Sequence, residues 1–482
     1  MLWSLPLFMG LALACGKKSS NNDSTGSGGN PVDPPVVVPP KSDVEFWLTQ
    51  SDKTVLFKKQ NTSLIFSTTS NSYSNIDVDD TQTYQQIDGF GYCLTGGSAS
   101  LLNSLSAANK DNVLKELFAA DSTFIGVSYL RISIGASDLS ANTFTYDDMP
   151  SGQTDMNLDH FSIDAEKTDL IPILKKIIAI NPNIKILGSP WSPPVWMKSN
   201  GSFKGGSLKT ECYATYAQYF VKYIQAMKAE GISIDAITVQ NEPLNGNNNP
   251  SLVMQSAEQA NFVKSNLGPA FQAAGISTKI IVWDHNADVA TYPLAILGDA
   301  DAKKYVDGSA FHLYSGSITA LSQVHDAYPD KNVYFTEQWV GGPGNFSGDL
   351  QWHVQNLIIG ATRNWSRNVL EWNLASDPSY NPHTSGGCTT CQGALTISGD
   401  AVARNVSYYI IAHAAKFVRP GSVRISSAQT TNLSTVAFKN PDGKKVLIVL
   451  NKGTAQEVFN IKVGSRLVTT ALSSGAVGTY VW

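Results

Sequence analysis

Short apolar runs alternate with amphipathic segments over most of the chain from residue 85 onward. Eight of these runs are rich in β-branched and aromatic residues, and segments such as 169–180 and 213–230 carry apolar positions at helical spacing. Alternating strands and helices predict an α/β fold with a parallel sheet, and eight units predict closure into a (β/α)8 TIM barrel. The predicted strands are 87–94, 127–134, 184–188, 236–239, 279–283, 308–313, 333–335 and 368–370.

Both flanks of the predicted barrel have a different pattern, in which short strands are separated by turn residues. After residue 417 we expect strands at 423–425, 435–438, 446–451, 457–461 and 466–472, and Asn440-Pro441-Asp442-Gly443 is a turn signal among them. The segment 44–78 is also strand-like. We therefore expect a small β-sandwich formed by 44–84 together with 417–482, attached to a barrel at 85–416.

The first 43 residues show no pattern that could form a core. Residues 2–14 are apolar but fewer than the roughly 20 that span a bilayer, which is typical of a secretory signal at 1–14. Cys15 follows Ala14 as in the lipobox of bacterial lipoproteins, although no Lys or Arg precedes the apolar run. The alternative is an ordinary cleaved signal in which Cys15 is incidental.

The segment 15–43 is rich in Ser, Asn and Gly and then in Pro, a composition typical of a linker. We therefore expect an exported bacterial lipoprotein at the outer membrane or cell surface, which contacts the membrane only through a lipid on Cys15. The 35 basic and 39 acidic residues give a net charge of −4, which argues against nucleic acid as a partner. The 10 Trp and 18 Tyr suit sugar binding, although ordinary core packing accounts for most of them.

Four cysteines remain after Cys15. Cys388 and Cys391 form a Cys-Thr-Thr-Cys sequence in a Gly-rich segment, which is compatible with zinc, redox chemistry or a small disulfide. Zinc would need two further ligands, and Cys93 and Cys212 are not spaced to supply them. We expect a local disulfide between Cys388 and Cys391, two buried or unpaired thiols, and no metal or organic cofactor.

Polar and aromatic residues follow the predicted strands, as expected if the carboxyl-terminal face of the barrel is an active site. Glu242 follows strand four and Glu337 follows strand seven, so the two side chains can meet across the barrel mouth. Glycoside hydrolysis needs two carboxyl groups flanking the scissile bond. A lone Glu would more often be a helix cap or an ion-pair partner, but two strand-terminal Glu residues among Trp, Asn and Tyr favour catalysis.

The surrounding motifs resemble glycoside hydrolase family 30, the glucosylceramidase and β-1,6-glucanase group, from about Gln85 to Trp482. The resemblance implies a retaining mechanism in which Glu242 is the acid/base and Glu337 the nucleophile. The motifs are Gln86-Ile87-Asp88-Gly89-Phe90-Gly91, Leu130-Arg131-Ile132-Ser133-Ile134-Gly135, Ser189-Pro190-Trp191-Ser192-Pro193-Pro194-Val195-Trp196-Met197-Lys198, Asn241-Glu242-Pro243 and Glu371-Trp372-Asn373-Leu374.

The same resemblance implies a set of substrate-binding residues. Asp138 is expected to accept bonds from two adjacent sugar hydroxyls, and Arg131 to orient nearby carboxylates through charge-assisted bonds. The alternative for both is a structural ion pair. Trp191 and Trp372 match sugar-contacting tryptophans, for which packing at the barrel rim is the alternative.

Four further residues complete the implied set. Asn241 matches an Asn that binds the sugar 2-hydroxyl, and Asn373 is included through the Glu371-Trp372-Asn373 motif. His312 and Tyr314 match residues beside the nucleophile, although a lone His is usually structural. Tyr314 is expected to donate to Glu337 and keep it ionised.

The proximity of Glu242 and Glu337 predicts that one of the two pKa values rises, because like charges at close range cannot both ionise at ordinary cost. We expect the raised pKa on Glu242, as the acid that carries the proton, and an ionised Glu337 as the nucleophile.

The substrate is inferred from the cysteine-bearing segment and from the predicted membrane anchor. Substrates in the family include glucosylceramide, β-1,6-glucan, xylosides, glucuronoxylan and β-1,6-galactan. The segment 386–393 resembles the cysteine-bearing loop of the β-1,6-glucanase branch, and a tethered lipoprotein suits an external polysaccharide. We therefore expect an endo-β-1,6-glucanase. Alternatives are a glucosylceramidase, β-glucosidase or β-xylosidase, and, in another class, a non-catalytic surface glycan-binding lipoprotein, which would not need both carboxylates.

Overall fold

The computed structural model describes residues 41–482. The predicted signal segment, Cys15 and nearly all of the predicted linker lie outside these residues. Residues 41–482 lie in one compact unit. None of the helices in 41–482 combines the length and apolar character needed to cross a membrane.

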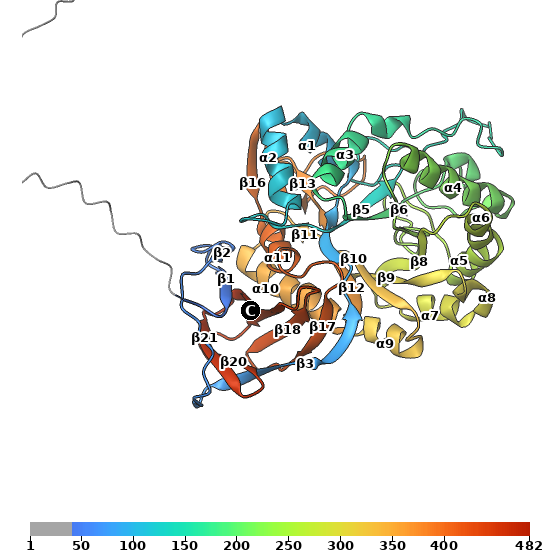
Figure 1. Ribbon diagram of the computed structural model, residues 1–482. Helices are drawn as coiled ribbons and strands as arrows, with labels where there is room; N and C mark the ends of the chain where they lie inside the picture. The colour runs from blue at the N-terminus through green and yellow to red at the C-terminus, as the bar shows by residue number, and fades with distance from the viewer. Residues whose placement is uncertain (1–40) are drawn as a thin grey trace, which may run out of the picture. The chain divides into compact units, whose positions relative to one another are not determined.

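Eight parallel strands close into a barrel in the order β10-β12-β4-β5-β6-β7-β8-β9 (Figure 1). Each coincides with one of the eight predicted strands, so the predicted barrel is confirmed. The largest differences are at β8, β9 and β12, which continue several residues past their predicted ends. The strands are β4 Gly89–Cys93, β5 Tyr129–Ile134, β6 Lys185–Pro190, β7 Ala236–Thr238, β8 Lys279–Ala287, β9 Val306–Gly316, β10 Asn332–Glu337 and β12 Ser366–Asn373.

Helices alternate with these strands in the chain and cover the outside of the barrel (Figure 1). In α3, Leu170, Leu174 and Ile177 recur at helical spacing and are buried, while Lys175 and Lys176 face away. The helices are α1 Gly96–Ser104, α2 Ala107–Phe118, η1 Asp164–Lys167, α3 Leu170–Ile180, η2 Val195–Met197, η3 Thr210–Cys212, α4 Tyr213–Ala229, α5 Ser256–Phe262, η4 Val263–Leu267, α6 Gly268–Ala273, α7 Thr291–Gly298, α8 Ala300–Lys303, α9 Ala320–Ala327, α10 Phe346–His353, η5 Val354–Ala361 and α11 Val406–Ala415.

The barrel interior is filled by its own small core. Seven of the eight strands each contribute one residue to a buried cluster of Tyr129, Leu187, Ala236, Ile281, Ala310, Tyr334 and Leu370. The eighth strand, β4, has Gly91 in its centre, where a Cβ would lie 1.9 Å from the carbonyl oxygen of Tyr129. The glycine therefore permits the close approach of β4 and β5, and a packed interior leaves the carboxyl-terminal mouth as the place for a site.

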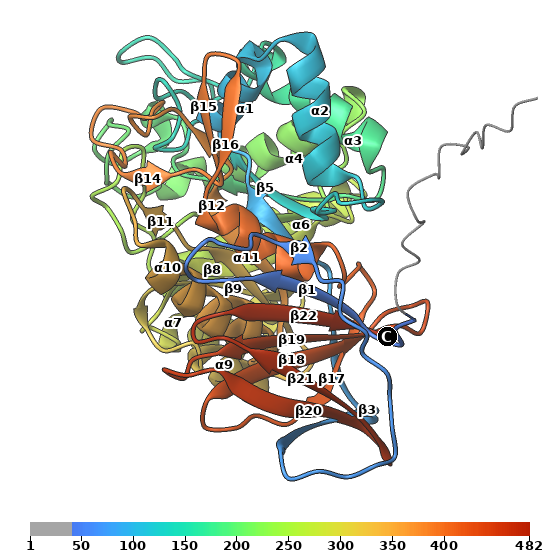
Figure 2. The same cartoon turned by 90° about the vertical axis from the view of Figure 1, so that its left-hand side faces the viewer.

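The remaining long strands form the predicted β-sandwich from both flanks of the barrel (Figure 2). The long strand β3 pairs antiparallel with β17 through its second half and parallel with β20 through its first half. Strand β22 was not predicted; it lies between β1 and β19. The strands are β1 Glu45–Thr49, β2 Lys58–Lys59, β3 Ser74–Gln86, β17 Val423–Ser427, β18 Leu433–Lys439, β19 Lys445–Asn451, β20 Glu457–Val463, β21 Arg466–Leu472 and β22 Val477–Val481.

Five short strands lie in the segments after β10 and β12. Strands β11 (Val340–Gly341) and β14 (Cys391–Gln392) pair antiparallel, and β13 (Ala375–Ser376), β15 (Leu395–Ser398) and β16 (Ala401–Arg404) form a small sheet. The β11–β14 pair connects the segment after Glu337 with the cysteine-bearing segment, so these two walls of the barrel mouth are joined.

Candidate active site

The two predicted catalytic glutamates lie at the carboxyl-terminal mouth of the barrel. Glu337 is the last residue of β10, and Glu242 follows β7 with a positive φ of 44°. Their exposed fractions are 6% and 8%, and both line a cavity of about 770 Å³. The site is therefore a nearly dry carboxylate pair that opens into a space large enough for sugar residues.

The separation of the two carboxylates distinguishes two reaction geometries. One oxygen of Glu242, one of Glu337 and one ring nitrogen of His312 all lie within 4.8 Å of one another. Retaining glycosidases place the carboxyl groups about 5–5.5 Å apart, whereas inverting enzymes need about 6.5–9.5 Å to admit a water. The arrangement therefore matches direct attack by one carboxylate on the sugar.

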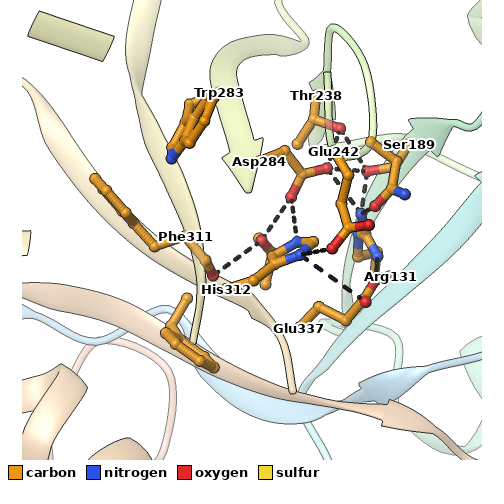
Figure 3. Close-up of polar contacts among 12 residues, drawn as sticks. Arg131, Ser189, Thr238, Glu242, Trp283, Asp284, Phe311, His312 and Glu337 are labelled. Atoms are coloured by element: carbon orange, nitrogen blue, oxygen red, sulfur yellow. Dashed lines mark hydrogen bonds and ion pairs between the residues drawn. The ribbon is translucent and has the colours of Figure 1, made fainter. Parts of the chain in front are cut away.

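Arg131, in β5, is fully buried at the centre of the site (Figure 3). Its Nη1 donates to Glu337 Oε2 at 2.5 Å, and its Nη2 donates to Asn241 Oδ1 at 2.6 Å and to Asp284 Oδ2 at 2.7 Å. A planar guanidinium can bind two carboxylates in fixed directions. The sequence left open whether Arg131 orients a catalytic carboxylate or forms a structural ion pair. Arg131 does both, because it forms an ion pair with Asp284 and another with Glu337, the expected nucleophile.

Asp284, in the second half of β8, was not predicted as a site residue. Its carboxylate accepts bonds from Arg131, Thr238 Oγ1 at 2.7 Å and Thr336 Oγ1 at 2.6 Å. Burial would raise its pKa, but the charge of Arg131, the hydrogen bond and charge of His312 and the bond from Thr238 hold the pKa far below the usual range. The register of β8 shifts between Trp283 and His285, and both Trp283 and Asp284 have left-handed backbone conformations with φ values of 73° and 70°. This bulge turns Asp284 into the barrel.

His312, in β9, lies between the acidic groups and has no exposed surface. Its Nδ1 is 3.1 Å from Glu242 Oε1 and 3.9 Å from Glu337 Oε1, and its Nε2 is 3.2 Å from Asp284 Oδ1 (Figure 3). Burial alone would lower the pKa of His312, but Glu337, Asp284 and Glu242 together raise it to about 9. His312 therefore contacts the catalytic carboxylates rather than the cavity, which it does not line.

Tyr314 lines the cavity and donates its hydroxyl to Glu337 Oε1 at 2.9 Å, as the sequence predicts. Glu337 thus accepts one bond at each oxygen, from Tyr314 and from Arg131. These two donors fix the plane of the carboxylate.

The pKa directions of the glutamates are the reverse of the expectation from the sequence. Burial raises the pKa of Glu337 above its usual value, although His312 and Arg131 oppose the rise. Burial would also raise the pKa of Glu242, but the hydrogen bond and positive charge of His312 lower it to about 2. The prediction was wrong because it did not take into account that the imidazole of His312 lies between the two carboxyl groups.

Asp138 lines the cavity with 5% of its surface exposed. The backbone N–H of Cys388 donates to Asp138 Oδ2 at 3.3 Å, and Cys388 and Cys391 form a disulfide with an S–S distance of 2.10 Å. Burial and the charge of Glu337 raise the pKa of Asp138 to about 7. Because Arg131 pairs with Glu337 and Asp284, the alternative of an Arg131–Asp138 ion pair is not seen.

The two predicted sugar-contacting tryptophans occupy different positions. Their rings stack with centroids 5.4 Å apart, and the Arg131 guanidinium lies 4.8 Å from the Trp191 ring centroid. Trp372 lines the cavity, whereas Trp191 is 2% exposed and does not line it. The position of Trp191 favours packing behind Trp372 over direct contact with a sugar.

Asn241 and Asn373 also differ in what their side chains contact. Asn241 Oδ1 accepts from Arg131, which leaves the amide Nδ2 as the group that can donate to a sugar. Asn373 Oδ1 accepts from Ser98 Oγ at 2.8 Å, and its Nδ2 donates to the carbonyl of Cys391 at 3.3 Å. Asn373 is therefore occupied in joining α1 to the disulfide segment and does not line the cavity.

Several cavity residues were missed by the sequence reasoning, among them His285, Asn245 and Trp339. Asn245 donates to Glu242 Oε2 at 2.8 Å. The signal was partly visible, because His285 and Trp339 stand two and four residues after the ends of predicted strands five and seven. Asn245 could not be found in this way because it lies in an irregular segment.

Within 41–482, the one group of three acidic or histidine ligands close enough to share a metal ion is Glu242, His312 and Glu337. The guanidinium of Arg131 already neutralises Glu337 at 2.5 Å. A cation at this position would lie beside that positive charge, so the donor set suits hydrolysis by carboxylates better than metal binding.

Comparison with known proteins agrees with this geometry. Residues 87–418 match the glycosyl hydrolase family 30 TIM-barrel domain, and residues 421–480 match the glycosyl hydrolase family 30 beta sandwich domain. The solved structure of the endo-β1,6-glucanase BT3312 is similar with a TM-score of 0.86 and 36% identity, covering 92% of this chain and 99% of that one.

Curated relatives cover most of the chain. An endo-1,6-β-D-glucanase of Aspergillus fumigatus is 36% identical over 412 residues, which are 79% of this chain and 82% of the relative. The lysosomal acid glucosylceramidase of Mus musculus is 28% identical over 431 residues, 83% of this chain and 81% of the relative.

Proposed function

The chain belongs to glycoside hydrolase family 30, a retaining family, and we propose that it is an endo-β-1,6-glucanase in which Glu337 is the nucleophile and Glu242 the acid/base. The observation that carries the catalytic part is the approach of one oxygen of each glutamate to within 4.8 Å inside the cavity. The similarity to endo-1,6-β-glucanases over about four fifths of each chain supports the linkage.

In the first half of the reaction Glu337 attacks the anomeric carbon and a proton moves to the departing glycosidic oxygen. Arg131 and Tyr314 hold Glu337 through one hydrogen bond at each oxygen, which restricts rotation of the carboxylate. In the second half water replaces the enzyme at the anomeric carbon, and Glu242 takes the proton of that water. Two displacements return the original anomeric configuration.

Binding of the sugar falls to residues that line the cavity. Asp138, held by the backbone of Cys388, is placed to accept bonds from adjacent hydroxyls. Trp372 and Trp339 supply flat apolar faces beside the glutamates. One further contact is proposed from Asn241, which does not line the cavity but stands next to Glu242 in the chain and is oriented by Arg131; it is the proposed donor to the 2-hydroxyl, a contact that strengthens at the transition state.

The test is release of reducing ends from a substrate panel of β-1,6-glucan, β-1,3-glucan, xylan and an aryl β-glucoside. We expect β-1,6-glucan to be cleaved into oligosaccharides of several lengths, and Glu337→Ala to abolish the release. Glucose as the sole early product would favour an exo-acting β-glucosidase, and glucosylceramide as the preferred substrate would favour a glucosylceramidase. Binding of glucan without any release would favour the non-catalytic alternative.

We also propose that the protein is an exported lipoprotein anchored through Cys15, on the sequence pattern of residues 2–15 alone. Detergent-phase partition of the protein from its own cells is the measurement. Partition into detergent that is lost in Cys15→Ser supports the anchor, and aqueous partition of the unaltered protein contradicts it.

A further inference from the structure

We propose that the proton used by the general acid is stored on His312 in the free enzyme, and that Asp284 is the positioning residue that keeps it there. In this arrangement His312 and Glu242 share one transferable proton and act together as the general acid. The inference rests on the role proposed above for Glu242.

The Nε2 side of His312 is fixed by Asp284. The Asp284 carboxylate receives hydrogen bonds from Arg131 Nη2, Thr238 Oγ1 and Thr336 Oγ1 and is fully buried. Because it is ionised and can only accept, His312 Nε2 at 3.2 Å from Oδ1 must carry a hydrogen. Asp284 thereby determines which ring nitrogen is always protonated.

The Nδ1 side of His312 is where the transferable proton lies. Nδ1 is 3.1 Å from Glu242 Oε1, and two bare lone pairs cannot face one another at that distance without cost. In the free enzyme one proton therefore occupies the gap, either on Nδ1 or on Oε1. Asn245 donates to the other oxygen, Glu242 Oε2, at 2.8 Å, which favours the charged carboxylate and hence the proton on Nδ1.

The charges around His312 agree with an imidazolium in the free enzyme. The groups that face it are Arg131 from β5, Glu242 after β7, Asp284 and His285 from β8, Tyr314 from β9 and Glu337 from β10. Burial by itself would lower the pKa of His312, but the carboxylates outweigh it and raise the pKa to about 9. Burial lowers the pKa of His285, so this second imidazole stays neutral and does not compete.

The proton balance of the reaction closes with this pair. As the glycosidic bond breaks, His312 Nδ1 passes its proton to Glu242, and Glu242 passes that proton on to the leaving oxygen, so the leaving group departs as an alcohol. The glycosyl ester forms on Glu337 beside a neutral His312 and a Glu242 carboxylate. When water attacks the ester, Glu242 accepts its proton and returns it to Nδ1, which restores the starting state.

The arrangement has a functional consequence. A carboxyl with a pKa near 2 would hold no proton at neutral pH, yet the pair with His312 retains one until the imidazole titrates near 9. The acid is thus available over a wide pH range, and Glu242 is already ionised when it must act as a base.

The direct test is NMR of the unbound enzyme labelled with ¹⁵N-histidine, with His312→Asn used to assign the resonance. We expect both ring nitrogens of His312 to be protonated from pH 6 to about 8, and Asp284→Asn to give a neutral ring above about pH 7. A neutral His312 at pH 6 in the unaltered enzyme overturns the proposal. No substrate is needed, so this result is independent of whether β-1,6-glucan is the substrate.

The second test is the pH dependence of kcat/KM with two aryl glycosides, one with a poor and one with a very good leaving group. For Asp284→Asn we expect the basic limb to move down by at least one pH unit with the poor leaving group only, since the good one needs little proton donation. Cys93→Ala is the matched control, because Cys93 Sγ also contacts Arg131, at 3.8 Å, but does not touch His312.

The outcomes separate positioning from simple structural support. A uniform fall in activity with an unmoved basic limb would show that Asp284 only supports the fold, and would overturn the proposal. If Asp284→Asn does not fold, Thr336→Val removes the hydroxyl that shares Asp284 Oδ1 with His312 Nε2, which leaves a stronger acceptor for His312 and should move the limb the opposite way, upward, by a smaller amount. An unmoved limb in that variant also counts against the proposal.

Discussion

Arg131 donates to Glu337 at 2.5 Å with its Nη1 and binds Asp284 at 2.7 Å with its Nη2, and the guanidinium has no exposed surface. One side chain thus orients the nucleophile and at the same time fixes the carboxylate that contacts His312. Lysine has the charge but lacks the planar fork, so it cannot hold both carboxylates in these directions.

The first prediction is that Arg131→Lys lowers kcat/KM by about 10²-fold or more, the size typical of losing one preorganised donor in a catalytic site. The free energy of unfolding should also fall by about 3–5 kcal/mol, because a buried carboxylate loses its partner. Steady-state kinetics and urea denaturation measure the two effects.

Arg367→Lys is the matched control for that variant. Arg367 binds both oxygens of Asp88, and the pair lies at the amino-terminal ends of β12 and β4, at the opposite end of the barrel from the glutamates. We expect this variant to lose stability and keep its kcat/KM. An equal fall in kcat/KM would show that Arg131 acts only through overall stability.

The second prediction concerns the division of roles between Glu242 and Glu337. Azide should restore turnover of Glu337→Ala and give the glycosyl azide of inverted configuration. With Glu242→Ala it should give the retained configuration, and only when the leaving group is good. The anomers are distinguished by NMR of the products. Inversion by the unaltered enzyme would contradict the separation of the carboxylates in the structure.

The third prediction is that the Cys388–Cys391 segment acts on substrate binding through Asp138. The N–H of Cys388 holds Asp138 Oδ2, and a Cβ on Gly387 would lie 2.4 Å from the backbone oxygen of Asp138. Gly387→Ala and the double variant Cys388→Ser/Cys391→Ser should therefore raise KM several-fold with a smaller change in kcat. Initial rates over a range of glucan concentrations measure both constants.

Gly386→Ala is the control for Gly387→Ala, because a Cβ at Gly386 meets no atom within 4 Å although its φ is +83°. Its effect on KM should be smaller than that of Gly387→Ala. Mass spectrometry should find Cys388 and Cys391 alkylated only after reduction. Alkylation without reduction, or equal KM values for the two alanine variants, would contradict this account.

The barrel could be predicted from the sequence because each of its strands and helices has a local pattern of apolar residues. Each buried strand is an apolar run between amphipathic helices, and strand order follows chain order around the closed barrel. Strand β22 was missed because its pattern contains Gly478 and ends near Trp482, and its place depends on pairing with β1, over 400 residues away. Long-range pairing of this kind leaves no local signal.

For the candidate site, the sequence could show which strands carry site residues at their carboxyl-terminal ends, but not all the contacts that these residues make. Glu242, Glu337, Arg131 and Tyr314 do converge as expected. Asp284 was missed because its direction depends on a backbone bulge that the residue types do not announce.

Two further features of the site could not be predicted from the sequence because they depend on which residues are neighbours in the folded structure. The pKa directions of the glutamates depend on where an imidazole lies between them, which no spacing in the chain encodes. The place of Trp191 behind Trp372 likewise depends on how rings from two strands stack.

The last prediction concerns His413, in α11, which joins the barrel to the sandwich. Thr479 Oγ1 donates to the carbonyl of His413, so the ring Nδ1–H must donate to Thr479 Oγ1 at 2.8 Å, and Nε2 accepts from Thr49 Oγ1 at 2.8 Å. The neutral ring satisfies these bonds, and a second ring proton would face the hydroxyl of Thr49. Burial accordingly lowers the pKa of His413 to about 3.

The sign of the effect on stability follows from this lowered pKa. Between about pH 6.5 and pH 3 the unfolded chain binds a proton at His413 and the folded chain does not, so stability present above pH 6.5 is lost as the pH falls. At pH 4.5 the loss from this residue approaches about 3 kcal/mol, at 1.36 kcal/mol for each pH unit. His413→Asn should be less stable than the unaltered protein at pH 7.5, and the difference should shrink towards pH 4.5. Urea denaturation across this range measures it. A difference that stays constant with pH would show that His413 is not held neutral in the fold.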